Sequence, residues 1–158
     1  LSCPGREVPA AGLAALAAAP WFRHLRELSL AGELPSDAFE ALAGLAPLPR
    51  VHTLDLSGGY FTEAAWARFG RTRALPALAR LSVEVCDLTG GRFGALAAAG
   101  GFALRALSAR GCAVGPDGAA LAAAPWAGAL RVLDLAWNHL RPAGARALAG
   151  SRALAGLR

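Results

Sequence analysis

The sequence predicts an α/β solenoid (horseshoe), with parallel strands on its concave face and helices on its convex face. The pattern LxxLxL occurs five times, with first positions at 25, 51, 78, 104 and 130, so the units are 26 or 27 residues long. Within a unit the hydrophobic period changes from 2 over this pattern to about 3.6 after it, which indicates a strand followed by a helix. One such unit cannot bury both of its faces, so consecutive units must stack.

The units form a single array over 1–158. The partial unit 1–24 comes first, and a further unit starts at 157–158. Neither end shows a polar cap, so we expect the native protein to continue beyond Arg158 or to self-associate end to end. The chain begins with Leu1 rather than methionine, and we interpret it as an excerpt of a longer protein. The five full units are 25–50, 51–77, 78–103, 104–129 and 130–156.

Helices are expected after each strand, for example around 38–45 and 143–148, where the hydrophobic period is helical. Ser36 and Thr62 each precede an acidic residue at an expected helix start, which is typical of an N-cap. Pro116 and Pro142 suit the first turn of a helix, where no hydrogen-bonding N–H is needed. The expected helix starts are Ser36, Thr62, Pro116 and Pro142.

The last full unit carries the most specific pattern, because 130–140 reads LxxLDLxxNxL and is followed by Gly144-Ala145 and Ala147-Leu148-Ala149. It resembles the ribonuclease-inhibitor-like subfamily of leucine-rich repeats, in a bacterial-type array, and the shared register spans nearly the whole chain. The resemblance implies a non-catalytic protein that docks partners on its curved face, as ribonuclease inhibitors and activators of small GTPases do. The family's ninth-position asparagine is present only as Asn138. The other units carry Glu33, Gly59, Cys86 and Cys112 there.

The composition indicates a packed protein without a membrane span. Hydrophobic residues make up 55% of the chain and charged residues 17%, which excludes a mainly disordered protein. The longest uncharged run, 8–22, is interrupted by two prolines and falls short of the ~20 residues that a spanning helix needs. The net charge is +5, but all 16 basic residues are arginine. Arginine-rich codon usage therefore explains a basic chain without a polyanionic partner.

The three cysteines lack the close spacings of a disulfide framework or a zinc site, which favours a reducing, cytoplasmic compartment. Equivalent positions of adjacent strands lie ~5 Å apart, so Cys86 and Cys112 could form a disulfide. We favour two small buried thiols at the ninth position instead. The three cysteines are Cys3, Cys86 and Cys112.

No motif indicates catalysis, a cofactor or a metal. GxSxG, HExxH, GxxxxGK[ST] and GxGxxG do not occur, so the common nucleophile, zinc, phosphate and dinucleotide signatures fail. His24, His52 and His139 fall in three different units without metal-ligand spacing. The glycine-rich stretch 90–94 could cradle an anion at a helix start, although a turn that opens a helix explains it as well. We therefore expect no enzyme.

The concave face is the expected binding surface, because positions three, five and seven of each unit face away from the core. These positions are polar, small and of mixed charge. They suit a protein partner better than a nucleic acid, which favours a basic stripe with stacking aromatics. Trp137 follows the seventh position, and tryptophan is enriched at binding hot spots, although it could simply cover the turn. The expected contact residues are Asp55, Arg80, Glu84, Arg110, Asp134 and Trp137.

A second surface is basic, because position two of consecutive units forms a row with a spacing of ~5 Å. This row favours an alternative function, binding of a polyanion such as a nucleic acid or an acidic protein, although a solvated strand start in an arginine-rich chain also explains it. The basic rim consists of Arg26, His52, Arg105 and Arg131, with Ala79 and Arg158 at the equivalent positions.

We therefore predict a non-catalytic protein–protein interaction module that binds an unidentified protein partner on its concave face. Neither a nucleic acid nor a membrane is the expected partner. Two alternatives stay open. The rim can bind a polyanion, or the repeats can serve as a targeting or spacer tract of a larger multidomain protein.

Overall fold

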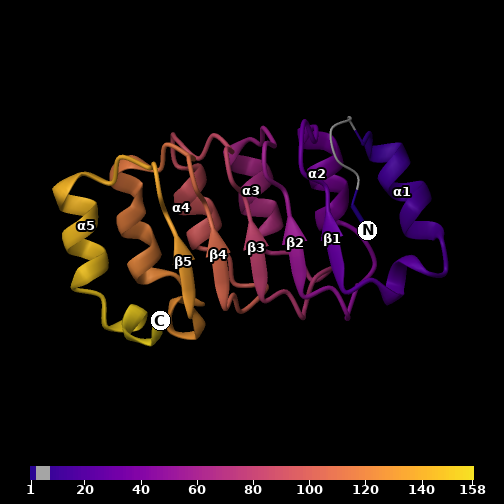
Figure 1. Cartoon of the computed structure of the whole chain (residues 1–158). Coiled ribbons are helices and arrows are strands. Elements are labelled where there is room, and N and C mark those ends of the chain that lie inside the picture. The colour runs from indigo at the N-terminus through magenta and orange to yellow at the C-terminus, as the bar shows by residue number, and fades with distance from the viewer. Residues whose placement is uncertain (3–7) are drawn as a thin grey trace.

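The computed structural model describes residues 1–2 and 8–158, which form one row of strand-and-helix units (Figure 1). Five parallel strands make a single sheet in the order of the sequence, β1-β2-β3-β4-β5. The central leucines of neighbouring strands lie side by side, from Leu28 and Leu54 to Leu107 and Leu133. The predicted α/β solenoid is confirmed. The strands are β1 (Glu27–Ser29), β2 (Thr53–Asp55), β3 (Arg80–Ser82), β4 (Ala106–Ser108) and β5 (Val132–Asp134).

Helices cover the other side of the sheet and form the second, convex layer (Figure 1). Because all strands are parallel, every strand begins at one edge of the array and ends at the other. Short 3₁₀ helices Phe22–His24, Ala127–Ala129 and Arg152–Gly156 lie at the edge where strands begin. The elements of the convex layer are α1 (Ala10–Ala18), α2 (Ser36–Ala43), α3 (Glu63–Phe69), α4 (Arg92–Ala97), the 3₁₀ helix Gly115–Ala123 and α5 (Arg141–Ala149).

The hydrophobic core fills the space between the two layers and contains a cluster of aromatic rings in the first half of the array. The three apolar residues of LxxLxL are buried in the three middle units. Phe39 stacks on Phe61 with ring centroids 4.1 Å apart and lies 4.9 Å from both Trp66 and Phe69. In the last unit, by contrast, Leu133 is only partly buried. Aromatic rings bury far more area than alanines, so the last units are held by less apolar burial.

The regular strands are shorter than the six residues that the LxxLxL pattern predicts, since each has three. The reason is that the chain bends at both ends of the pattern. Leu25 and Leu130 still end 3₁₀ helices when they enter it. Beyond each strand, position eight has a positive φ in every full unit, which turns the chain toward the convex layer.

The expected helix starts are partly confirmed. The Thr62 side chain caps α3 by accepting a hydrogen bond from the N–H of Ala65 at 3.1 Å. Pro142 lies in the first turn of α5, as predicted. Ser36 was expected as an N-cap but is the first residue of α2, and its hydroxyl donates to the carbonyl of Tyr60 at 2.9 Å. Ser36 therefore links two neighbouring units.

The unit 104–129 has a 3₁₀ helix, Gly115–Ala123, where a helix of the α type was expected. Pro116 is in its first turn, as predicted, but Gly115 and Gly118 lie in the same segment. Each glycine disfavours an α-helix by about 1 kcal/mol relative to alanine. A side chain at Gly118 would also collide with Leu140 of the next unit, so the glycine permits close packing of neighbouring units.

Position nine forms a buried polar ladder in the last three units. Its side chain donates a hydrogen bond to the main-chain carbonyl at position six of the preceding unit. Burial raises the pKa of the Cys86 thiol to about 12 and that of Cys112 to about 11, so both keep the proton that they donate. Both are free thiols, and Cys3 lies outside the described residues. The bonds run from Cys86 to Leu56 (3.3 Å), from Cys112 to Val83 (2.9 Å) and from Asn138 to Ala109 (2.6 Å).

Main-chain hydrogen bonds extend the sheet beyond its outer strands. At one edge the N–H of Ser29 donates to the carbonyl of Leu1 at 2.8 Å. At the other edge the N–H of Arg158 donates to the carbonyl of Arg131 at 2.9 Å, as position two does throughout the array. Within the described residues, no helix is long and apolar enough to cross a membrane.

Candidate functional site

The five strands present alternating side chains, as the period of two predicts. In β1 to β4 the middle residue is buried, whereas the residues on either side are exposed or half-buried. The concave face is therefore built from positions three and five of each unit. It continues at position seven, where Ser57, Glu84 and Arg110 are half-buried.

Serine and carboxylate side chains along this face are linked to one another across the strands. Ser57 donates from its hydroxyl to a carboxylate oxygen of Asp55 at 2.6 Å, and its oxygen lies 2.8 Å from that of Ser82. Ser29 reaches the other carboxylate oxygen of Asp55 at 3.3 Å. These contacts fix Asp55 between two neighbouring units. Its carboxylate is thus held in place before any partner binds.

Glu84 is fixed in a similar way. The hydroxyl of Ser108 donates to its carboxylate at 2.7 Å, and the main-chain N–H of Glu84 donates to Ser57 at 3.1 Å. A chain of short polar contacts therefore crosses β1 to β4. Side chains that are ordered beforehand lose less conformational entropy when they bind.

The middle of the concave face is hollowed. A broad, open depression of about 460 Å³ extends across β2 to β5, and three of the predicted contact residues, Asp55, Arg80 and Asp134, line it together. Arg80 is exposed in the middle of the sheet, and Val132, also exposed, forms part of the rim of the depression. The depression is wide and shallow, and it combines both signs of charge with apolar floor residues.

The remaining predicted contact residues gather at the C-terminal end of the face. The Arg110 guanidinium lies 3.6 Å from the Asp134 carboxylate and 4.6 Å from the centroid of the Trp137 ring. Asp134 also accepts a hydrogen bond from the N–H of Ala136 at 2.8 Å. Trp137 is 76% exposed, so it does not serve the core. The cation–π contact instead holds a solvent-facing indole in one orientation.

Trp137 occupies a backbone position that the sequence pattern alone does not explain. Position eight has a positive φ in each full unit, and in the first four units its N–H donates to the position-seven carbonyl of the next unit. Three units have glycine there, the residue for which this conformation is free of strain. The other two have Val85 (φ 55°) and Trp137 (φ 60°). The five residues are Gly32, Gly58, Val85, Gly111 and Trp137.

Val85 is the residue that sequence reasoning missed. A β-branched side chain in the left-handed region is strained by about 1–2 kcal/mol, and Val85 is 70% exposed, so packing does not compensate for it. Tyr60, 73% exposed, lies at the same edge, and both residues line one shallow depression. The signal was available, since Val85 replaces a glycine in the aligned units. We call Tyr60, Val85 and Trp137 the exposed apolar ridge.

The basic rim lies on the opposite edge, where the strands begin. Consecutive position-two residues are joined by main-chain hydrogen bonds, which confirms that they form one row. Arg26 and Arg105 are exposed, His52 is half-buried, and Arg131 donates to the carbonyls of Gly128 and Leu130. The rim and the concave contact residues are therefore separate surfaces.

The described residues hold no group of three or more His, Cys, Asp or Glu side chains placed to bind a metal ion. At the glycine-rich stretch 90–94, Gly91 precedes α4, but the Glu63 carboxylate lies where a side chain at Gly91 would project. Hydrogen bonds from the Thr89 hydroxyl and N–H, with nearby Arg92, hold the pKa of Asp87 below its usual range. Two carboxylates thus flank this turn, which disfavours an anion there.

Comparison with known families gives one match, to a leucine-rich repeat over residues 130–149. This segment is the unit whose sequence pattern is most specific, and it contains β5, Asn138 and α5. No curated protein matches the chain. The match and the five-stranded parallel sheet fit a leucine-rich repeat protein. Leucine-rich repeats are generally protein-interaction modules and typically lack enzymatic activity.

Proposed function

We propose that this chain is a non-catalytic module that binds a protein partner through its concave face and the adjoining exposed apolar ridge. One observation carries the proposal most directly. Trp137 is 76% exposed in a strained backbone conformation, and its ring is contacted by Arg110, which in turn pairs with Asp134. Strain that serves no packing purpose is typical of functional sites.

The chemistry of the surface favours a folded protein as the partner. Its depression is open and broad, whereas sites for small molecules are concave and bury most of the ligand. Both signs of charge occur on it, with Arg80 and Arg110 among Asp55, Glu84 and Asp134. Mixed charge gives specificity through complementary pairing, and the apolar ridge can supply the desolvated centre of the interface.

The contact between Trp137 and Arg110 also lowers the entropy that the tryptophan side chain loses on binding. An indole whose orientation is already restricted by a guanidinium loses less entropy when a partner covers it. Gly111 lies between Val85 and Trp137 in the row of position-eight residues, and it has no side chain. The gap that it leaves between two large apolar groups is a feature that a partner side chain can fill.

The finer assignments rest on the resemblance of the repeat pattern. We propose that the repeats belong to the ribonuclease-inhibitor-like subfamily and act in the cytoplasm, where Cys86 and Cys112 stay reduced. A role as a spacer or targeting tract is the second option, but it does not explain a strained, exposed Val85 or an ordered Trp137.

The test is capture of partners from the source lysate, after nuclease treatment, with two matched double variants. Arg80→Glu with Trp137→Ala alters the concave face and the ridge. Arg141→Glu with Trp21→Ala makes the same chemical changes elsewhere, because both residues are exposed and lie outside this surface. We expect the control to retain the same protein as the unaltered chain and the first variant to lose it. Equal retention by both variants would overturn the proposal.

A further inference from the structure

One edge of the array is basic along its whole length. We call it the return edge, and it comprises the six segments that lead from the end of a helix to the start of the next strand. They contain nine of the 16 arginines and none of the 11 acidic residues. Because parallel strands all begin at the same side, the segments lie together at the lower edge in Figure 1. The segments are 19–26, 44–52, 70–79, 98–105, 124–131 and 150–158.

The arginines of the return edge face solvent, and one of them, Arg131, also donates to main-chain carbonyls. All nine are exposed. The three salt bridges among the described residues use other arginines, so none of the nine is paired with a carboxylate there. The nine residues are Arg23, Arg26, Arg50, Arg71, Arg73, Arg105, Arg131, Arg152 and Arg158.

Codon usage does not account for this distribution. A preference for arginine over lysine changes which basic residue is used, but it does not remove acidic residues from one edge and leave them on the other. Glu33, Glu84 and Asp87 all lie at the opposite edge, between a strand end and a helix start. The segregation of charge is therefore a property of the surface.

Helix dipoles do not account for it either. Cations are stabilised within the last turn of a helix, and the effect falls off beyond that turn. Only Arg68 and Arg146 occupy the last turn of an α-helix. Position-two arginines such as Arg105 lie at the start of a strand, where no helix end stabilises them.

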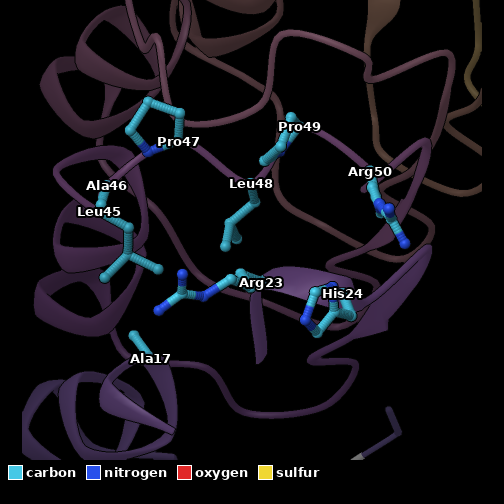
Figure 2. A pocket seen from close by; sticks show the side chains of 9 residues that line it. All are labelled: Ala17, Arg23, His24, Leu45, Ala46, Pro47, Leu48, Pro49 and Arg50. Carbon is cyan, nitrogen blue, oxygen red and sulfur yellow. The ribbon is translucent and has the colours of Figure 1, made fainter. Parts of the chain in front are cut away.

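The edge is hollowed beside several of these arginines. Arg23, His24 and Arg50 border one hollow, with Leu45 and Leu48 (Figure 2). A second hollow is lined by Arg71 and Arg73 together with small residues such as Gly100 and Gly101. No acidic residue lines either hollow.

We propose that the return edge binds the phosphate backbone of double-stranded nucleic acid without sequence specificity. A row of guanidinium groups suits a polymer of phosphates, since arginine pairs with phosphate oxygens through two N–H groups. Five strand spacings extend over about 24 Å, the length of about seven base pairs. Phosphate contacts position a protein on the duplex but carry no sequence information.

The other anionic surfaces fit less well. Stable attachment to a bilayer usually needs an apolar anchor besides charge, and Trp21 is the one exposed large apolar residue on the described part of this edge. An acidic protein would meet few apolar or aromatic groups to form a desolvated centre, because the residues between the arginines are mostly alanine, glycine and proline. A duplex needs charge alone for non-specific binding.

The test is a titration of the chain against fluorescent duplex DNA of about 20 base pairs, in several unrelated sequences, at increasing salt. If about five phosphates are contacted, the affinity falls about 500-fold between about 50 and 200 mM salt, and it is equal for all sequences. The absence of binding at low salt, or an affinity that does not depend on the salt concentration, would overturn the inference.

Matched double variants locate the site. Arg50→Glu with Arg105→Glu alters two unpaired arginines of the return edge, whereas Arg141→Glu with Arg146→Glu makes the same charge change on α5. We expect the first pair to weaken duplex binding at least about tenfold and to lower the salt slope by about two, and the second pair to change the affinity less than about threefold. Equal weakening by both pairs would show that net charge alone acts, and would refute a defined site.

Two further probes separate the remaining partners. Tighter binding to vesicles of phosphatidylcholine and phosphatidylserine than to the duplex would reassign the edge to a membrane surface. Tighter binding to polyglutamate would reassign it to an acidic protein. The inference does not rest on the concave-face function. The Arg80→Glu, Trp137→Ala variant leaves the return edge intact. We therefore expect its affinity for the duplex to stay near that of the unaltered chain, even when it no longer captures the protein partner.

Discussion

Removing the side chain of Asn138 tests the buried polar ladder that joins the last units. Asn138 is 2% exposed, and its side chain makes four hydrogen bonds. Its oxygen accepts from the N–H groups of Cys112 (2.9 Å) and Val114 (3.2 Å), and its Nδ2 donates to the carbonyls of Ala109 (2.6 Å) and Ala136 (3.2 Å). The Ala136 carbonyl also accepts from another N–H, whereas the other three groups have no second partner. Asn138→Ala therefore leaves three buried groups unsatisfied.

An unsatisfied buried group costs about 1–1.5 kcal/mol at the low end of measured values, so we expect Asn138→Ala to lower the free energy of unfolding by about 3–4 kcal/mol. Asn138→Cys is the matched control, because the two preceding units use cysteine here. A thiol can still donate to Ala109, so we expect a smaller loss of about 2–3 kcal/mol. Urea unfolding followed by circular dichroism measures both. A loss below about 1 kcal/mol for Asn138→Ala, or a larger loss for the cysteine variant, would refute the ladder argument.

Three further outcomes follow from local geometry. Val85→Gly relieves left-handed strain and should raise the unfolding free energy by up to about 1 kcal/mol while weakening capture of the partner; a clear loss of stability would contradict it. Gly101→Ala places a methyl group against the Thr72 carbonyl and should cost about 1–3 kcal/mol in a urea melt, whereas Gly100→Ala, in open space, should be tolerated; equal effects would contradict the packing. Because burial raises the pKa values of Cys86 and Cys112 to about 12 and about 11, the unfolded chain loses these protons first as the pH rises. The stability that the two thiols contribute should be complete below about pH 8.5 and fall by about 1.4 kcal/mol per pH unit per thiol toward pH 11; a flat profile there would contradict it.

The fold could be predicted because the sequence repeat determines both the secondary structure of each unit and the way the units stack. A constant spacing of 26 or 27 residues and a change of hydrophobic period leave few arrangements other than stacked parallel strands. The ladder could also be predicted, because a small side chain with one proton can replace asparagine as a donor. Cys86 and Cys112 therefore occupy the same place as Asn138.

The structure differs from the prediction at a few places, for local reasons that the pattern of apolar positions does not show. The Ser36 hydroxyl turned to the neighbouring unit because the Tyr60 carbonyl lies within reach. Two glycines disfavour the α-helical form in the 3₁₀ helix Gly115–Ala123, and one of them, Gly118, lies against Leu140. These effects depend on contacts between units, which the sequence of one unit does not show.

The candidate site was predictable in outline but not in detail. The alternation of strand side chains placed Asp55 and Glu84 on the concave face, but it does not show their hydrogen bonds to serines of neighbouring units. Val85 was not predicted, because only positions three, five and seven were expected to face outward. A comparison of position eight across the units would have found it, since the left-handed turn makes any residue other than glycine exceptional there.

The most direct test of the central claim is the affinity of the captured partner for single variants of the two exposed tryptophans. Trp137 belongs to the exposed apolar ridge, whereas Trp21 lies on the return edge. If the ridge is the centre of the interface, Trp137→Ala weakens binding about 30-fold, as loss of a hot spot of about 2 kcal/mol requires, and Trp21→Ala changes it less than about twofold. An unchanged dissociation constant for Trp137→Ala would contradict binding of the partner through this face.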